Sequence, residues 1–131
     1  MVLLEECIEV LKADSEIFFD KKNDKLFENF ESLIDFNEYG RIDWGKYPNR
    51  KIIKESDKLL DYFDSEYCYI FWNDESLPVI KTKFNLFLKN IDDVLAVSYD
   101  TWILSNSEKI IIEFFHDDII SVINIPAPAS L

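Results

Sequence analysis

The chain has 131 residues and a mass of 15.5 kDa, which is enough for one domain that buries about two-thirds of its unfolded surface. A hydrophobic share of 48% and an aromatic share of 15% exclude an intrinsically disordered chain. The net charge of -12 argues against direct binding to nucleic acid or to an anionic membrane and favours a basic partner. With 2 Gly and 1 His, the chain also lacks a glycine-rich phosphate loop and most residues used in acid–base catalysis.

The cysteines and the N-terminal segment indicate a cytoplasmic protein. Cys7 and Cys68 are too few for a disulfide framework, and both lie in apolar patterns, so we expect reduced core residues. The segment 1–11 carries three glutamates and no basic region, which is unlike a secretory signal. The longest apolar runs are about six residues, whereas a membrane span needs roughly 18. We therefore expect no membrane partner. In the absence of a glycine-rich loop or a metal-ligand spacing, we also expect no cofactor.

Helical patterns dominate the first half of the chain. Apolar residues at helical spacing predict a helix over 3–11, with a continuation to Phe18 and Phe19. A second helix is predicted to begin at Asn23 or Asp24 as the N-terminal cap. Its apolar face would consist of Leu26, Phe27, Phe30, Leu33 and Ile34. Residues 37–49 contain both glycines and predict an ordered loop, and a short helix is expected from Ser56 to about Asp64.

Strand patterns dominate the second half. The aromatic run 67–72 predicts a central strand that ends in a polar turn at 73–76. A further helix is expected over 84–91. Asp92 and Asp93, which follow it, are expected to precede the next strand. Three strands are predicted over 94–104, 109–115 and 119–125 in the rhythm of a meander. The segment 126–131 contains two prolines and is expected to be a frayed tail.

These elements predict an α+β fold in which N-terminal helices pack on a C-terminal antiparallel sheet of about four strands. We expect a single domain over 1–131, with an acidic helical part at 1–45 and a part with a helix and the sheet at 46–125. Residues 92–131 hold seven acids against one base, so the predicted sheet region is strongly acidic. Such self-repulsion is costly unless a cationic partner offsets it.

Three constellations could carry chemistry or binding. His116, Asp117 and Asp118, with Glu113 one strand position back, could hold a metal ion, but a hairpin turn is the stronger interpretation because the chain has no second histidine. Asp92, Asp93 and Asp100 could bind magnesium, yet adjacent acids on a strand point to opposite faces. No nucleophile signature occurs. The tryptophans could anchor a partner, although core packing explains Trp44, Trp72 and Trp102 better.

Segments 67–80 (YCYIFWNDESLPVI), 91–105 (IDDVLAVSYDTWILS) and 109–119 (KIIIEFFHDDI) resemble the small acidic immunity proteins of bacterial contact-dependent growth inhibition and polymorphic toxin systems. The shared pattern is an aromatic strand, a Leu-Pro turn, a strand with Asp-Thr-Trp and a hairpin with an Ile-Glu-Phe strand. The resemblance implies a cytosolic antidote that binds the toxic C-terminal domain of a cognate effector, often a nuclease. It also implies that the antidote carries out no reaction of its own.

Net charge supports the same interpretation, since nuclease domains need cationic surface that an acidic protein can occupy. We expect the partner to be a basic toxin domain and the chain to be a monomer or a homodimer. An exposed edge on the last strand would permit either dimerisation or strand addition with a partner. The residues expected at the partner interface lie on predicted turns, at strand starts or among the tryptophans: Trp72, Asp74, Glu75, Asp92, Asp93, Trp102, Asp117 and Asp118.

Two alternatives to the antidote remain open on the sequence. An acidic nucleic-acid mimic that inhibits a DNA-binding protein would carry its acids at regular, phosphate-like spacing. A small metal-dependent hydrolase would use Glu113, His116, Asp117 and Asp118 as ligands.

Overall fold

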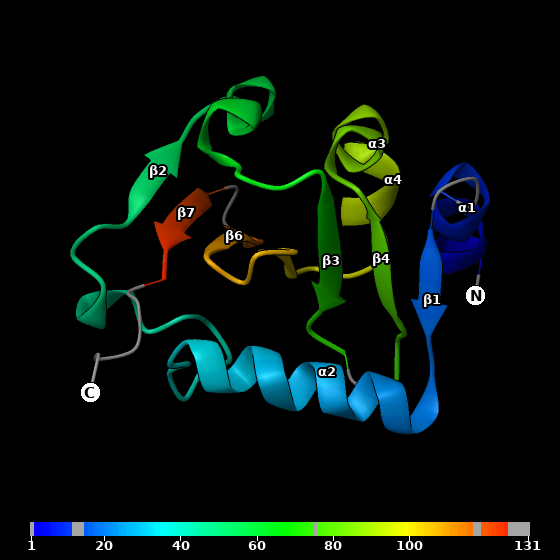
Figure 1. Cartoon of the computed structure of the whole chain (residues 1–131), viewed down its shortest axis with the longest axis horizontal. Helices are drawn as coiled ribbons and strands as arrows, with labels where there is room; N and C mark the ends of the chain where they lie inside the picture. Colours follow the sequence, from blue (N-terminus) through cyan, green and yellow to red (C-terminus); the bar gives the residue numbers. More distant parts are fainter. Residues whose placement is uncertain (1, 12–14, 75, 117–118, 126–131) are drawn as a thin grey trace.

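A computed structural model describes residues 2–11, 15–74, 76–116 and 119–125. In this part of the chain, a seven-stranded antiparallel sheet has the order β1-β4-β3-β5-β6-β7-β2 (Figure 1). The strands are β1 (Glu16–Phe18), β2 (Lys51–Ile53), β3 (Tyr67–Trp72), β4 (Val79–Lys83), β5 (Thr101–Ser105), β6 (Ile110–Phe114) and β7 (Ile120–Asn124). The helices are α1 (Val2–Leu11), α2 (Asp20–Leu33), α3 (Phe84–Lys89) and α4 (Ile91–Leu95), with 3-10 helices η2 (Trp44–Lys46) and η3 (Ser56–Tyr62).

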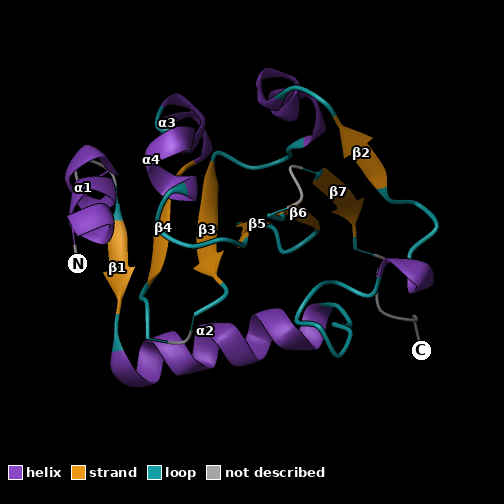
Figure 2. Ribbon diagram, turned by 180° about the vertical axis from the view of Figure 1, so that it is seen from behind, coloured by secondary structure: helices purple, strands orange, loops and turns teal. Residues whose placement is uncertain are grey.

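Helices cover both faces of the sheet. The long helix α2 lies along one side of the strands, and α1, α3 and α4 lie on the other (Figures 1 and 2). Two separate clusters of buried apolar side chains correspond to these two layers. The three-layer arrangement explains why β3, β5 and β6 are buried or half-buried at every position rather than at every second one, because each face of these strands meets a helix or loop.

The α2 layer is built from aromatic rings. Phe30 stacks on Phe71 of β3 with ring centroids 4.4 Å apart, and it also approaches Trp102 of β5 at 5.8 Å. Phe36, which follows α2, meets the edges of both Phe30 and Trp102 at 5.6 and 5.3 Å. Aromatic pairs of this geometry each contribute about 1 kcal/mol beyond the burial of their surface. The apolar face predicted for this helix is therefore confirmed.

A buried asparagine fastens the start of α2 to the turn after β3. The helix begins at Asp20, so the predicted capping role of Asn23 or Asp24 is wrong. Asn23 instead lies inside the helix, accepts a hydrogen bond from the amide of Val79 at 2.7 Å and donates to the carbonyl of Leu77 at 3.4 Å. Asparagine near a helix start is typical of an N-terminal cap, but here its side chain bonds to backbone groups of another segment instead.

The sheet is larger than the sequence pattern indicates. The prediction of about four strands is wrong, because it omits β1, β2 and β4. Both β1 and β2 have three residues, too few to show alternation, whereas β4 (VIKTK) does alternate buried positions with half-buried lysines, a short strand pattern that the prediction missed. The predicted extension of the first helix to Phe18 and Phe19 is also wrong, since β1 occupies 16–18 and pairs with β4.

The helices are not confined to the N-terminal part, which corrects the predicted arrangement. Residues 94–100 were expected in a strand, but α4 continues to Leu95 and β5 begins only at Thr101. Asp92 and Asp93 stand in the first turn of α4, where a helix N-terminus favours carboxylates. The β-branched residues of this segment had favoured a strand, yet the spacing of Ile91, Val94 and Leu95 suits a helix packed on α1.

Most of the other expectations agree with the structure, but the exposed edge expected on the last strand is wrong. The strand at 67–72, the helix at the chain start, the loop at 37–49 and the last two strands are confirmed within one or two residues. The helix at 56–62 is of the 3-10 type. The last strand is not an edge, because β2 pairs with β7, and β1 and β2 stand at opposite ends of the sheet (Figure 2). The predicted frayed tail at 126–131 lies outside the described residues.

Both cysteines are buried, so neither thiol is expected to react in the folded protein. Each is fully inaccessible to solvent. Burial, helped by the charge of Asp93, raises the pKa of the Cys7 thiol to about 12, and burial raises the pKa of Cys68 as well. A chromogenic disulfide reagent at pH 8 should therefore modify no thiol in buffer and two in urea. Rapid modification of one thiol without urea would contradict this packing.

Candidate functional site

A buried carboxylate lies at the centre of the α2 layer. Cross-strand pairing places Phe71, Trp102, Glu113 and Ser121 in one row over β3, β5, β6 and β7. The Glu113 side chain is fully buried, and four N–H groups donate to it. Its Oε1 accepts from Arg41 and from the Trp44 indole, both at 2.9 Å. Its Oε2 accepts from the Ile42 amide at 3.0 Å and from the Trp102 indole at 3.1 Å.

This carboxylate fixes the loop after α2 to the sheet. Three of its four donors come from residues 41–44, so the carboxylate bonds the middle of the loop to the centre of β6. Arg41 also lies over the ring of Phe115 at 4.3 Å, and Arg50 lies over Trp44 at 4.6 Å. Buried charge-assisted hydrogen bonds of this kind hold a segment in one place. The loop therefore presents its tip, residues 37–40, in a defined position.

The tip of the loop is a tight turn. The side-chain oxygen of Asn37 accepts from the amides of Tyr39 and Arg41 at 2.9 and 3.2 Å, and the Asn37 carbonyl accepts from Gly40 at 3.1 Å. Gly40 has φ +76°, a conformation that glycine adopts without strain. It faces the side chain of Asn73 in the turn after β3, so two segments far apart in the sequence meet here.

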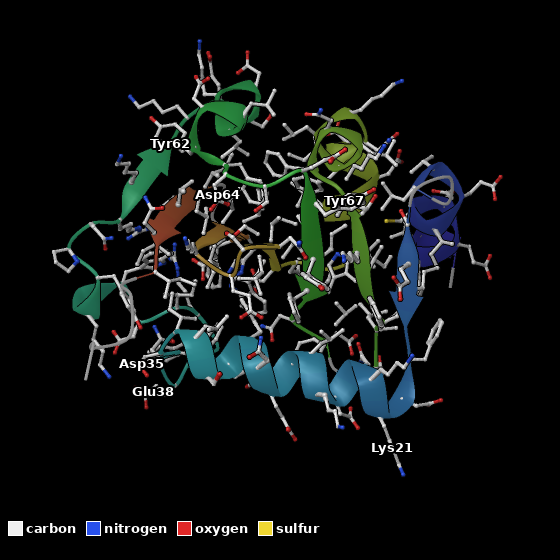
Figure 3. The ribbon with its side chains drawn as sticks, in the orientation of Figure 1. Lys21, Asp35, Glu38, Tyr62, Asp64 and Tyr67 are labelled. Atoms are coloured by element: carbon white, nitrogen blue, oxygen red, sulfur yellow. The ribbon has the colours of Figure 1, made fainter. Side chains whose placement is uncertain are left out.

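Between these segments lies a pocket of about 310 Å³, which we call the aromatic pocket. Its lining comes from the second half of α2, the loop tip and the ends of β3 and β5. Four aromatic side chains of the α2 layer contribute to it: Phe27, Phe30, Phe36 and Trp102. Three carboxylates also line it: Glu31, Glu38 and Asp74. Figure 3 shows Glu38 beside Asp35 beyond the end of α2, far from Tyr62, Asp64 and Tyr67 at the other end of the strands.

A second and larger hollow of about 710 Å³ lies on the other side of Asp74. Its lining is mostly apolar and comes from 95–99, 114–116 and Leu3. Tyr99 at its rim is 88% exposed. His116 closes one side, where its amide and its Nδ1 atom lie 3.1 and 3.0 Å from a carboxylate oxygen of Asp100. Asp74, in the turn after β3, therefore lies between the two hollows.

Asp74 is held as a charged group. Its Oδ1 accepts hydrogen bonds from the hydroxyl and the amide of Ser76, at 2.6 and 2.9 Å, and these bonds lower the pKa of the Asp74 carboxyl. Among those predicted interface residues that the structure describes, Asp74 alone lines both hollows.

The other predicted interface residues are placed less directly. Trp102 and Trp72 are buried, at 4% and 0% exposure, so neither protrudes as an anchor. Both line the aromatic pocket, although the indole of Trp72 donates to the carbonyl of Val94 in the opposite layer at 3.1 Å. Asp92 and Asp93 lie on α4 and line neither hollow. Glu75, Asp117 and Asp118 lie outside the described residues.

Sequence patterns missed the contributions of Glu31, Phe36, Glu38 and Tyr99. The composition of the loop after α2 predicts an ordered segment, but it does not indicate that this loop folds back to the turn after β3. One usable signal was the charge of α2, whose lysines stand near its start and whose last turn contains Glu31 and no base. Helix dipoles favour the reverse arrangement, so acids at this end indicate a role other than stability.

No metal centre or membrane span is found in the part of the chain that the structure describes. Within residues 2–11, 15–74, 76–116 and 119–125, no three histidine, cysteine or acidic residues are grouped for metal binding. Glu113, one of the expected ligands, has both oxygens engaged by N–H donors. Nor is any helix in those residues long and apolar enough to cross a membrane.

Comparison with known proteins identifies the family. No curated protein matches the chain. The family model described as "CdiI immunity protein EcoliA0-like" matches residues 1–123, and so includes both layers, the buried Glu113 and every described residue of the two hollows. This agrees with the resemblance of the second half of the chain to antidotes of growth-inhibition systems. The chain therefore belongs to the EcoliA0-like CdiI immunity proteins, which bind and neutralise a cognate toxin protein.

Proposed function

We propose that this immunity protein neutralises a basic, nucleic-acid-cleaving toxin domain. In this proposal, the surface around Asp74, in the turn after β3, covers the cationic surface of the toxin. The observation that supports this site is the convergence of two hollows on one carboxylate that stays charged. Two exposed acids, Glu31 and Glu38, line the aromatic pocket together with it, and the chain as a whole carries a charge of -12. A toxin that holds phosphates needs lysines and arginines, and these are the groups that such a surface attracts.

The remaining interface residues of this proposal either line a hollow or lie close in sequence to residues that do. Trp72 and Trp102 would take part as the lining of the aromatic pocket, and Glu75 follows Asp74 directly in the chain. Asp117 and Asp118 follow His116, which lines the larger hollow, and Asp92 and Asp93 precede its 95–99 wall. In this proposal inhibition needs no reaction, because a bound acidic surface excludes nucleic acid from the toxin.

Calorimetry with the toxin domain encoded beside this chain tests the proposal. We expect nanomolar affinity in 50 mM NaCl and about tenfold weaker binding in 500 mM NaCl, because salt screens the attraction between opposite charges. The immunity protein should also stop nucleic-acid cleavage by that domain at a 1:1 ratio.

A matched pair of variants locates the interface. Asp74→Lys lies at the proposed site, whereas Asp61→Lys lies on η3, which is also exposed but lines neither hollow. Both variants change the net charge equally, so a general electrostatic effect would weaken both complexes alike. We expect only Asp74→Lys to weaken binding strongly. Equal affinities of the two variants would place the toxin elsewhere, and a toxin without nuclease activity would overturn the proposed substrate class.

A further inference from the structure

The aromatic pocket has the composition of a site for one cationic side chain. Building on the basic toxin proposed above, we propose that it receives the guanidinium group of an arginine from the toxin, stacked on the aromatic rings and surrounded by Glu31, Glu38 and Asp74. The volume of about 310 Å³ lies at the small end of ligand pockets, which run from roughly 300 to 1,000 Å³, and suits a side chain rather than a whole peptide.

The aromatic wall provides the apolar part of such a site. Phe30, Phe36 and Trp102 contact one another, with centroid distances of 5.3 to 5.8 Å. Phe36 and Phe27 are only half-buried, so their rings remain available from the pocket side. Aromatic faces attract cations, and they also cover the methylene stem of a long basic side chain.

The carboxylates provide the charge, and no ion pair in the described part of the chain neutralises them. The pocket lining contains no lysine, arginine or histidine. Among the described residues, Glu31 and Glu38 form no ion pair, and Asp74 bonds only to the neutral Ser76 and through its backbone. By contrast, Asp35 and Asp43, just outside the pocket, lie 3.5 and 3.8 Å from Lys46. An external cation is the group that this lining lacks.

The position of Glu31 is unfavourable for folding alone. It stands in the last turn of α2, a helix of 14 residues whose last turn carries no base. The carbonyl end of a helix repels negative charge, and a lysine there would be more stable. Glu31 therefore destabilises the end of its own helix, and it lies beside two further acids without ion pairs and four aromatic rings. A partner that brings a positive charge would explain why a glutamate stands there.

Arginine fits this site better than lysine. A guanidinium group is planar and weakly hydrated, so it stacks on rings while its edge donates to carboxylates on several sides. The Glu113 network holds the loop tip with Glu38 in place, so little order has to be created on binding.

Titration with single amino-acid derivatives tests the pocket without the toxin. The probes are the N-acetyl methylamides of arginine, lysine and citrulline, followed by the NMR signals of the Trp102 indole N–H and the Gly40 amide. Citrulline has the shape of arginine without its charge. We expect millimolar binding of the arginine derivative, and about tenfold weaker binding of the citrulline derivative. Equal shifts with citrulline, or tighter binding of lysine, would overturn the assignment.

Variants of the immunity protein confirm the place of binding. Glu38→Gln combined with Asp74→Asn should weaken arginine binding about tenfold, and Phe36→Leu should weaken it through loss of a ring. Asp61→Asn removes an acid outside the pocket and should leave the affinity unchanged. The Trp102 indole signal, which reports the hydrogen bond to Glu113, shows in every variant whether the layer is folded.

The outcome separates this inference from the proposed function. Tight toxin binding without any arginine response would leave the nuclease antidote standing and refute the pocket. Arginine binding without affinity for a basic toxin domain would refute the antidote proposal and retain the pocket. If toxin binding and arginine binding are both observed, the toxin's arginines can be replaced one at a time. One of these replacements should lower the affinity for the parent protein but not for the Glu38→Gln, Asp74→Asn variant.

Discussion

Replacing Glu113 with glutamine is expected to lower the free energy of unfolding by about 3 kcal/mol, although the two side chains have the same shape. The carboxylate accepts from four N–H groups, and all four donors are directed at two oxygens. Glutamine would keep one oxygen and turn an NH2 group toward two of the donors. It would also remove the negative charge that lies 2.9 Å from the Arg41 guanidinium.

Urea unfolding, followed by tryptophan fluorescence, measures the loss. Two of the three tryptophans donate to Glu113, so the native spectrum should change as well as the midpoint. Glu28→Gln on the exposed side of α2 is the matched control and should stay within about 0.5 kcal/mol of the parent. A loss below about 1 kcal/mol for Glu113→Gln would show that the buried network is not what fixes the loop to the sheet.

Replacing Glu31 with lysine is expected to weaken toxin binding about 100-fold and to raise stability at the same time. The first effect comes from a positive charge placed in the site of an incoming arginine, where like charges cost several kcal/mol. The second comes from a base in the last turn of α2, which the helix dipole favours by about 0.5 kcal/mol. Because affinity would fall while stability rises, unfolding of the variant could not be the cause of the lost binding.

Calorimetry with the toxin and urea unfolding of the same preparations measure the two effects. Glu28→Lys is the control, since it lies one turn earlier on α2, is exposed, and lines neither hollow. It makes the same change in net charge and should keep most of the affinity. Equal losses for both variants would mean that only overall charge matters. A less stable Glu31→Lys protein would mean that this glutamate serves the fold.

The charge of the whole chain and the elements with a strong local pattern could be predicted from sequence. The helix α2 has apolar residues at regular helical spacing, and β3 and β6 are apolar except for Glu113, so their patterns indicate a buried helix and buried strands. Short edge strands could not be predicted, because three residues show no pattern of their own and take their conformation from the strand beside them. The family resemblance depended on the same continuous runs, which is why it centred on the second half of the chain.

The candidate site depended on what no local pattern contains. In the run Ile-Ile-Ile-Glu-Phe of β6, the glutamate could equally face water, and only the packing of 41–44 and Trp102 against β6 makes it a buried acceptor. Asp74 was recognisable as a turn residue, but its neighbours Glu31 and Glu38 lie about 40 positions away in sequence and meet it only in the folded chain. Sequence by itself determined an acidic α+β immunity protein; tertiary structure decided which acids are neutralised inside and which remain unpaired around a pocket, because pairing depends on distance in space.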